Sequence, residues 1–337
     1  MATHRRIGSR FKANNDTGFS NKADTASSRF VNKDGSYNLR KTGLGFITRF
    51  SIFQTMLTIP RWKFAGVILI FYVVMNLLFT SIYLIVGTDQ LQGMIGAAPW
   101  VKFREVFYFS TQTFTTVGYG RVNPVGDGVN IIASLESLTG LLSLAIGTGL
   151  IYGRFARPQA YLIFSEHALI SPYKDKTALM FRFVNYKNKH SLTNVDVKVN
   201  VGLKVENDGE TTYGYYTLAL EREKVESLPM SWTVVHPLDE NSPLSGFTEE
   251  DMKHADVEIY AQIRGYDDVF SDMVQQRTSY TYHEILFHRK FSRMFRESED
   301  GKTTILELDK LSHHTEIEKK EKKAIEVPSM EQTTVQV

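Results

Sequence analysis

Residues 115–120 read TTVGYG and follow FREVFYFSTQTF at 103–114, an apolar, aromatic stretch that is too short to cross a lipid bilayer. A short string with glycines at 118 and 120 arises often by chance and would fit a β-prone bend in an ordinary loop. The alternative is a short helix that enters a bilayer and turns back as extended backbone. Such backbone exists at membrane depth only where it is buried in protein or lines a water-filled cavity.

Two long apolar segments flank this stretch. No residue between Ala65 and Val86 is charged, and at about 1.5 Å per residue the segment can cross a hydrocarbon core of about 30 Å. It is too long, and lies too far into the chain, for a signal peptide. The second segment, Val129 to Tyr152, contains Glu136 and three glycines, so we expect it to line a cavity or to pack against partner helices. The sequence predicts a membrane pore domain over 61–158, with an outer helix at 62–86, a pore helix at 103–115, extended backbone at 116–120 and an inner helix at 129–153.

Basic residues indicate the orientation of the two spans. Before the first span stand Arg40, Lys41, Arg49, Arg61 and Lys63; after the second stand Arg154, Arg157, Lys174 and Lys176; the connecting loop has Lys102, Arg104 and Arg121. This bias predicts a multi-pass protein of the cell membrane with both termini in the cytoplasm. The absence of cysteine fits a soluble part that lies in reducing cytosol.

The N-terminal part contains two predicted regions. Residues 1–43 are polar, and we expect a mostly disordered cytoplasmic N-terminus. Over 44–60, Phe46, Phe50, Phe53 and Leu57 recur at helical spacing until Pro60, which predicts an amphipathic slide helix on the inner membrane face. A short core helix of a soluble domain is the alternative.

The second half of the chain alternates apolar and polar residues, as in NVDVKVNVGLKV at 194–205 and VEIYAQIRGY at 257–266. Seven or eight such strands without long helices predict a cytoplasmic, immunoglobulin-like all-β sandwich over 159–311, followed by a charged, disordered tail over 312–337. A net charge of +2 does not indicate nucleic-acid binding. Because the soluble half lacks catalytic, metal-binding and phosphate-binding motifs, we expect neither an enzyme nor a bound cofactor.

Five motifs in order carry a family resemblance. They are RFVNKDGSYNLR at 29–40, FSTQTFTTVGYG at 109–120, GRFARP at 153–158, HPLDENSPL at 236–244 and RTSYTYHEI at 277–285. With them the chain resembles the inward-rectifier potassium channels, and among these the bacterial members. The resemblance implies a homotetramer that conducts K⁺ passively without a voltage sensor, and its bacterial members imply a bacterial inner membrane as the location.

The resemblance makes residues 116–120 a selectivity filter. Glycines at 118 and 120 permit backbone conformations closed to other residues, so successive carbonyls can turn toward one axis. In potassium channels as a class, rings of such carbonyls replace the hydration shell of the ion. The expected K⁺ ligands are the backbone carbonyls of Thr116, Val117, Gly118 and Tyr119, with Gly120 completing the filter.

The inner helix supplies a cavity and a gate. Leu144, Thr148 and Tyr152 stand at i, i+4 and i+8, close to one helix face. By resemblance, Leu144 replaces the acid with which strong rectifiers hold polyamine blockers, so we expect weak rectification; polyamines and barium are the expected blockers. Tyr152 matches a bulky residue at the inner bundle crossing, where four rings can shut the pore. The alternative for Tyr152 is an interfacial tyrosine that faces lipid.

Two residues are predicted to support the filter. Glu136 should not share the face of Tyr152, and an ionisable group at that depth needs a partner, which the back of the filter and pore helix can supply. A protonated or solvated carboxyl near the outer surface is the alternative. The other residue is Gln112. By resemblance, Gln112 and Val122 replace a glutamate and an arginine that brace the filter in eukaryotic relatives, so that brace is missing, although Arg121 is adjacent.

Charged residues suggest two further sites. Arg61, Lys63, Arg154 and Arg157 are predicted to bind anionic lipid, with activation and inhibition both open; simple topology-setting charge explains them equally well. Asp268 matches an acidic position that lines the cytoplasmic pore of the family, whereas a solvated loop carboxylate is the alternative.

The predicted function is a potassium channel gated at the inner bundle crossing, with modulation by anionic lipid and by movement of the cytoplasmic domain. Three alternatives belong to other classes. A membrane receptor would bind a ligand in the sandwich and carry no potassium flux, a membrane-anchored enzyme would need a catalytic motif, and a nucleotide-sensing channel would need a glycine-rich strand-to-helix turn.

Overall fold

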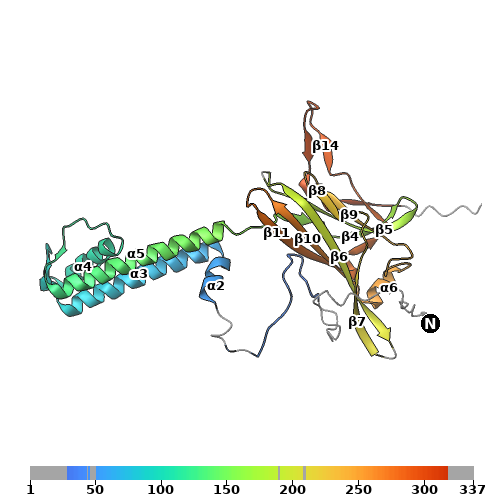
Figure 1. Ribbon diagram of the computed structural model, residues 1–337. Helices are drawn as coiled ribbons and strands as arrows, with labels where there is room; N and C mark the ends of the chain where they lie inside the picture. The colour runs from blue at the N-terminus through green and yellow to red at the C-terminus, as the bar shows by residue number, and fades with distance from the viewer. Residues whose placement is uncertain (1–28, 44, 46–50, 189, 208–209, 318–337) are drawn as a thin grey trace, which may run out of the picture. The chain divides into compact units, whose positions relative to one another are not determined.

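The computed structural model describes residues 29–43, 45, 51–188, 190–207 and 210–317, and the chain divides into two compact units (Figure 1). A helical unit comprises Lys41–Arg157. A β unit comprises Pro158–Val337 together with Met1–Arg40. Each unit has its own core.

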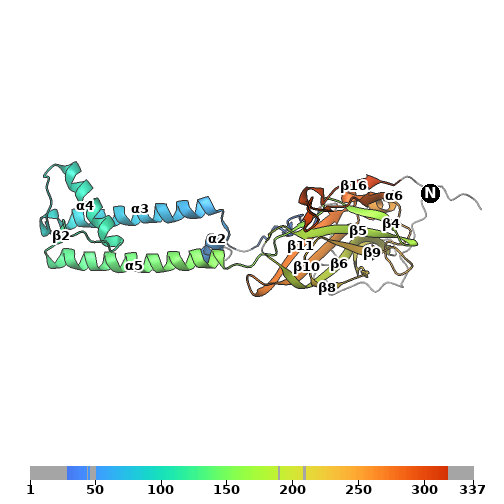
Figure 2. The ribbon, with the colours of Figure 1, turned by 90° about the horizontal axis from the view of Figure 1, so that it is seen from above.

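Two long helices form the frame of the helical unit. The outer helix α3 covers Arg61–Val86 and the inner helix α5 covers Asp127–Phe155, and the two lie side by side in both views (Figures 1 and 2). Both are long and apolar enough to cross a bilayer. The shorter helix α4, Pro99–Phe114, packs against both of them at one end. This arrangement is the predicted pair of membrane spans with a short helix between them.

Local sequence sets the ends of these helices. Pro60 directly precedes α3, and Pro99 occupies the first position of α4, where the missing N–H costs nothing. The short helix therefore begins at Pro99, four residues before the predicted start at 103. The inner helix runs two residues further at each end than predicted. Helix α2, Ile52–Thr58, lies inside the predicted slide helix, of which residues 44 and 46–50 are outside the described part.

A small apolar core joins helices α3, α4 and α5. Tyr83 of α3, Val106 of α4 and Val129 of α5 have no exposed surface, and Phe109 and Val122 pack beside them. The loop from α3 to α4 contains the turn η1, Thr88–Gln90, and the strand β1, Leu91–Gln92. Strand β1 pairs with β2, Asn123–Pro124, so the backbone before α4 and the backbone after TTVGYG are held together.

The β unit contains two five-stranded sheets, which confirms the predicted all-β fold. In the first, the order is β11–β10–β6–β7 with β8 also on β6; the strands are β6 Leu192–Asn207, β7 Glu210–Thr217, β8 Lys224–Ser227, β10 Glu258–Asp267 and β11 Asp272–Thr281. In the second, the order is β12–β4–β5–β3 with β9 also on β5; the strands are β3 Leu162–Phe164, β4 Ala168–Tyr173, β5 Lys176–Asn185, β9 Trp232–Pro237 and β12 Ile285–Phe287. All pairs are antiparallel except β12 with β4.

Period-two burial explains why these strands form a sandwich. In β6, Val195, Val197, Val199, Val201 and Leu203 are all buried, whereas Lys198 between them is exposed. Their side chains join those of Phe181 and Phe183 from β5 in one core between the sheets. A helix and turns complete the unit: α6 Glu249–His254, η2 Tyr282–Glu284 and η3 Leu308–Lys310.

Both predicted disordered ends contain ordered structure. Within the predicted tail, β16 at His314–Glu316 pairs with β13 at Arg289–Phe291, next to the hairpin of β14, Phe295–Glu297, and β15, Thr304–Leu306. Within the predicted N-terminus, Val31 is buried and bridges to Tyr37. Disorder was therefore the wrong prediction for these two segments: the N-terminal one buries Val31 on the β unit, and the C-terminal one pairs its backbone with β13. Residues 1–28 and 318–337 lie outside the described part.

Candidate functional site

The TTVGYG segment is anchored on the end of α4. The backbone N–H of Thr116 donates to Thr113 (3.0 Å), and the N–H groups of Val117 and Gly118 both donate to the carbonyl of Gln112 (2.9 and 3.2 Å). These bonds satisfy carbonyls of the last helical turn that have no partner within the helix. They also direct all three N–H groups toward α4.

Four consecutive backbone carbonyls of this segment are unpaired within the described part of the chain. Among the described residues, no hydrogen bond reaches the carbonyls of Thr116, Val117, Gly118 or Tyr119, whereas the carbonyl of Gly120 accepts one from Asn123 Nδ2 at 2.8 Å. The angle φ is positive at Thr116 (59°), Gly118 (51°) and Gly120 (79°) and not at the residues between. Alternating handedness turns successive peptide groups the same way, which suits a row of oxygens aimed at one cation.

The predicted cavity and gate residues share an uncovered face of α5. In the single chain, 68% of Leu144 and 73% of Tyr152 are exposed, and Thr148 between them is exposed too. At i, i+4 and i+8 these side chains drift by only about 40° per step around the helix. Neither α3 nor α4 of the same chain covers them.

Glu136 lies away from this exposed face of α5 and is fully buried against the other two helices. Its carboxylate accepts hydrogen bonds from Tyr83 Oη of α3 (2.7 Å) and from Ser110 Oγ of α4 (2.5 Å). Ser110 also lies 3.2 Å from the carbonyl oxygen of Asn76, and Asn76 is itself fully buried. The sequence did not identify Tyr83, Ser110 or Asn76. The reading of Glu136 as a solvated surface carboxyl is wrong, since the side chain has no exposed area.

A second carboxylate lies on α4, at a position that the sequence interpretation passed over. Glu105 is 4% exposed, and its carboxylate pairs with Arg121 Nη1 at 3.3 Å. Its other oxygen accepts the N–H of Ile95 at 2.9 Å. Gln112 contributes its backbone carbonyl to the filter segment, and Val122 is buried among apolar side chains. A glutamate inside an aromatic helix too short to span a membrane was the signal that could have identified this residue.

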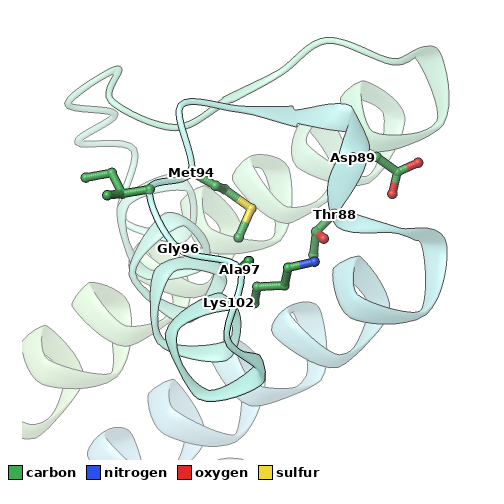
Figure 3. Close-up of a pocket in the computed structure, with 7 residues that line it drawn as sticks. Thr88, Asp89, Met94, Gly96, Ala97 and Lys102 are labelled. Atoms are coloured by element: carbon green, nitrogen blue, oxygen red, sulfur yellow. The ribbon is translucent and has the colours of Figure 1, made fainter.

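The loop above α4 also forms an open pocket on the surface of the helical unit (Figure 3). It is lined by Thr88, Asp89, Met94, Ile95, Gly96, Ala97 and Lys102. Figure 3 shows Lys102 extending from α4 toward Thr88. The pocket contains none of the predicted site residues.

The predicted lipid-binding residues differ in what they contact. Arg61 and Arg157 are exposed, and Lys63 lies over the Trp62 ring at 5.3 Å. The guanidinium of Arg154 instead donates to the carbonyls of Met56 (2.5 Å) and Ile59 (2.7 Å) at the C-terminal end of α2. Arg154 therefore links α2 to α5, a role that the sequence did not reveal.

Asp268, the predicted cytoplasmic-pore residue, lies in the turn between β10 and β11 and is exposed. Its neighbour Asp267 is fully buried, accepts the N–H groups of Val269 and Phe270, and lies 3.0 Å from His190 Nδ1. The buried aspartate thus fixes the turn and leaves Asp268 facing solvent within the single chain.

Residues 29–38 are held on the β unit by the charged side chains of Arg29 and Lys33. Arg29 forms an ion pair with Glu284 at 2.6 Å, and Lys33 Nζ donates to the carbonyl of Glu166 at 2.7 Å and lies 3.8 Å from the centre of the Tyr280 ring. Between them, the carboxylate of Glu258 accepts the N–H of Phe30. Burial raises the pKa of Glu258.

Because of Lys33, the stability of the β unit is expected to change with pH in the alkaline range. Burial, the largest influence, lowers the pKa of Lys33 from 10.5 to about 8, although Glu284 favours the charged form. Between pH 8 and 10.5 the unfolded chain therefore binds more protons than the folded chain, and stability should rise with pH. We expect the melting temperature, followed by tryptophan fluorescence, to rise from pH 8 to 10 less steeply in Lys33→Met than in the wild type. Lys198→Met, at an exposed position of β6, is the control, and equal slopes in all three proteins would contradict the prediction.

Comparison with known proteins gives consistent matches over both units. The family described as "Inward rectifier potassium channel C-terminal domain" matches residues 162–332, and the family "Ion channel" matches residues 67–156. The inward rectifier potassium channel Kirbac3.1 of Paramagnetospirillum magnetotacticum is 33% identical over 281 residues, which cover 82% of this chain and 92% of that protein.

More distant relatives extend beyond this chain. The G protein-activated inward rectifier potassium channel 1 of Bos taurus and that of Homo sapiens are each 26% identical over 291 residues, covering 78% of this chain and 56% of each relative. A solved structure, the sporulation control protein Spo0M of Bacillus subtilis, overlaps 37% of this chain and 47% of that chain with a TM-score of 0.21 and 11% identity, too little to support an argument. The match over 162–332 and the relative at 33% identity show the family: the chain belongs to the inward rectifier potassium channels.

Proposed function

We propose that four copies of this chain form a potassium-selective, weakly rectifying channel in the cell membrane, a bacterial inner membrane. Residues 116–120 of each copy are the filter, and K⁺ is coordinated by the carbonyls of Thr116, Val117, Gly118 and Tyr119. The carbonyl geometry of this segment carries the proposal. Four consecutive unpaired carbonyls are tolerated at membrane depth only where they face water or an ion, and the segment follows a short helix between two spans.

The remaining parts of the proposed channel are arranged along the pore axis on which the four filters meet. The uncovered face of α5 lines the cavity with Leu144 and Thr148 and closes at Tyr152. Both termini and the β unit lie in the cytoplasm, where Asp268 lines an extension of the pore and raises the local cation concentration. Gln112 and Glu136 support the filter from behind through α4.

Anionic lipid is the proposed modulator. Arg61, Lys63 and Arg157 are exposed near the inner ends of the two spans, where anionic headgroups lie. Arg154 belongs to the same basic cluster, but two of its donors are occupied by α2 carbonyls, so it would transmit the position of α2 to the gate. Movement of the β unit would act on the same inner helix.

Rubidium uptake into liposomes that contain the purified protein and internal K⁺ tests the proposal. We expect rubidium uptake that barium blocks, and we expect no comparable uptake when sodium is offered in place of rubidium. Lipid mixtures with and without anionic headgroups, each at several pH values, reveal modulation. Absence of selective uptake in every mixture, also after the gate is opened by mutation, would contradict the proposal and favour a receptor.

Tyr152→Ala is the variant that opens the gate. Four truncated side chains widen the constriction and let it stay wet, so we expect rubidium uptake to rise several-fold while barium block is retained. The matched control is Ile151→Ala, one residue earlier and about 100° around the helix. Equal uptake by wild type and Tyr152→Ala would place this tyrosine at the lipid interface instead.

A further inference from the structure

The buried carboxylate of Glu105 is held by backbone and side chain from the two loops that flank the helix and the filter. One oxygen lies 3.3 Å from Arg121 Nη1, and the other accepts the N–H of Ile95 at 2.9 Å. Arg121 is the residue that directly follows the filter, and Ile95 belongs to the loop that precedes α4 and passes over its first turns (Figure 3). Glu105 therefore lies at the point where three segments meet.

The backbone around Arg121 is fixed as well. A Cβ atom at Gly93 would lie 1.9 Å from the carbonyl oxygen of Arg121, so the two loops touch backbone to backbone, and Gly93 adopts a φ of +94°. Strands β1 and β2 pair immediately beside this contact. Asn123 of β2 donates to the carbonyl of Gly120, the last residue of the filter. Any shift of Arg121 would thus be passed directly to the outer end of the filter.

The buried charge of Glu105 makes the ion pair with Arg121 important for the structure of this loop. A carboxylate with only 5% of its side chain exposed is costly unless a cation and hydrogen-bond donors compensate it. Arg121, whose side chain is 48% exposed, is the cation in contact with it. Loss of Arg121 would leave the carboxylate with one backbone donor, and the loop would have to rearrange to hydrate it.

The location on α4 also fits a role at the filter. Glu105 precedes Gln112 by two helical turns, so the two side chains share nearly the same face, about 10 Å apart along the axis. Gln112 is uncharged and Val122 is buried in an apolar cluster, so neither can form an ion pair between helix and filter. The charge pair that this chain does have lies at the outer end.

We propose that Glu105 and Arg121 are positioning residues that fix the outer end of the filter and so maintain its preference for K⁺ over Na⁺. The inference rests on the proposed function of residues 116–120. Neither side chain touches the permeant ion. The pair acts through the Arg121–Gly120 peptide, which sets the direction of the last filter carbonyls.

The test compares Arg121→Gln, Arg121→Lys and the exchanged pair Glu105→Arg/Arg121→Glu, all in the full-length protein. Rubidium and sodium uptake into liposomes give the selectivity, and the melting temperature in detergent with KCl minus that with NaCl gives K⁺ binding without any flux. We expect Arg121→Gln to lower the K⁺/Na⁺ preference roughly 3- to 30-fold and to reduce the melting-temperature difference. Arg121→Lys should keep both, and the exchanged pair should recover part of the selectivity.

The control is Arg296→Gln, which removes an ion pair with Glu307 of similar length (3.2 Å) in the β unit and should leave both measurements unchanged. If the wild type is selective and Arg121→Gln is equally selective, the inference is overturned while the proposed function stands. If the wild type itself shows neither selective uptake nor a K⁺-dependent melting difference, the proposed function fails, and the inference fails with it. If Arg121→Gln does not fold, the other two variants decide. Loss of K⁺/Na⁺ selectivity in Arg121→Lys would overturn the inference. Retained selectivity in Arg121→Lys, together with partial selectivity in the exchanged pair, would support it.

Discussion

Gly118→Asp is expected to abolish barium-sensitive rubidium uptake, reducing it to the level of empty liposomes, without unfolding the chain. Gly118 has a φ of +51°, and aspartate adopts this left-handed conformation more easily than most residues. A Cβ atom there meets nothing within 4 Å. The substitution therefore changes the ion path rather than the packing: in the proposed tetramer it places four carboxylates beside the carbonyl rings, where a cation must pass without being trapped.

The matched control is Gly301→Asp in the hairpin between β14 and β15. Gly301 also has a positive φ (+67°) and open space around its Cβ position, but it lies in the β unit, away from the predicted ion path. Size-exclusion profiles should match the wild type for both variants, and only Gly118→Asp should lose uptake. Selective uptake through Gly118→Asp at the wild-type rate would mean that residues 116–120 do not form the filter.

The membrane spans and the short helix were predictable because they depend on local composition. The uncharged run from Ala65 to Val86 indicates a span by itself, and TTVGYG marks the point where α4 must end. The start of α4 was missed because the aromatic pattern begins at Phe103, whereas Pro99 begins the helix through its preset backbone angle. Apolar periodicity therefore predicts that a helix exists better than it predicts the residues at which the helix begins and ends.

The β unit was predictable where one face of a strand is buried. Strand β6 alternates valine with polar residues and was predicted from this pattern. Strand β11 lacks such a pattern, because DMVQQRTSYT has only weak alternation, and the strand exists through pairing with β10 along its whole length. The segment 29–38 is too polar to fold alone, and its order depends on partners such as Glu284 and Glu258, more than 200 positions away in the sequence.

The residues of the candidate site also differ in how far the sequence alone predicts them. The backbone chemistry of the filter follows from its own residues, so the sequence was sufficient to locate it. The side-chain partners of Glu136, Arg121 and Arg154 depend on which helices and loops meet, and a single sequence does not contain that information. For Glu136 the sequence required a partner without identifying it, and the structure supplies Tyr83 and Ser110.

Glu136→Leu is expected to destabilise the protein strongly. Removal of the carboxylate leaves the buried hydroxyl of Tyr83 without its acceptor, which costs about 1–3 kcal/mol. It also takes from Ser110 its short bond and leaves only the longer contacts with Asn76. We expect the melting temperature in detergent and the yield of folded protein both to fall. Glu136→Gln keeps the shape and one acceptor oxygen and should lose less. A Glu136→Leu protein as stable as the wild type would show that these bonds contribute nothing.

A triple variant separates stability from filter support. In Tyr83→Phe/Ser110→Ala/Glu136→Leu, no hydroxyl is left unpaired. Apart from Asn76, whose Oδ1 loses the Ser110 donor, every hydrogen-bond partner is replaced by an apolar group, which can be nearly neutral for stability. If Glu136 only satisfies buried hydroxyls, the triple variant should recover both the melting temperature and the K⁺/Na⁺ preference. If Glu136 holds α4 behind the filter, as we propose, the melting temperature should recover while selectivity stays low, because the hydrogen bond that fixes the C-terminal half of α4 to α5 remains absent. Recovery of both properties would therefore argue against a supporting role for Glu136.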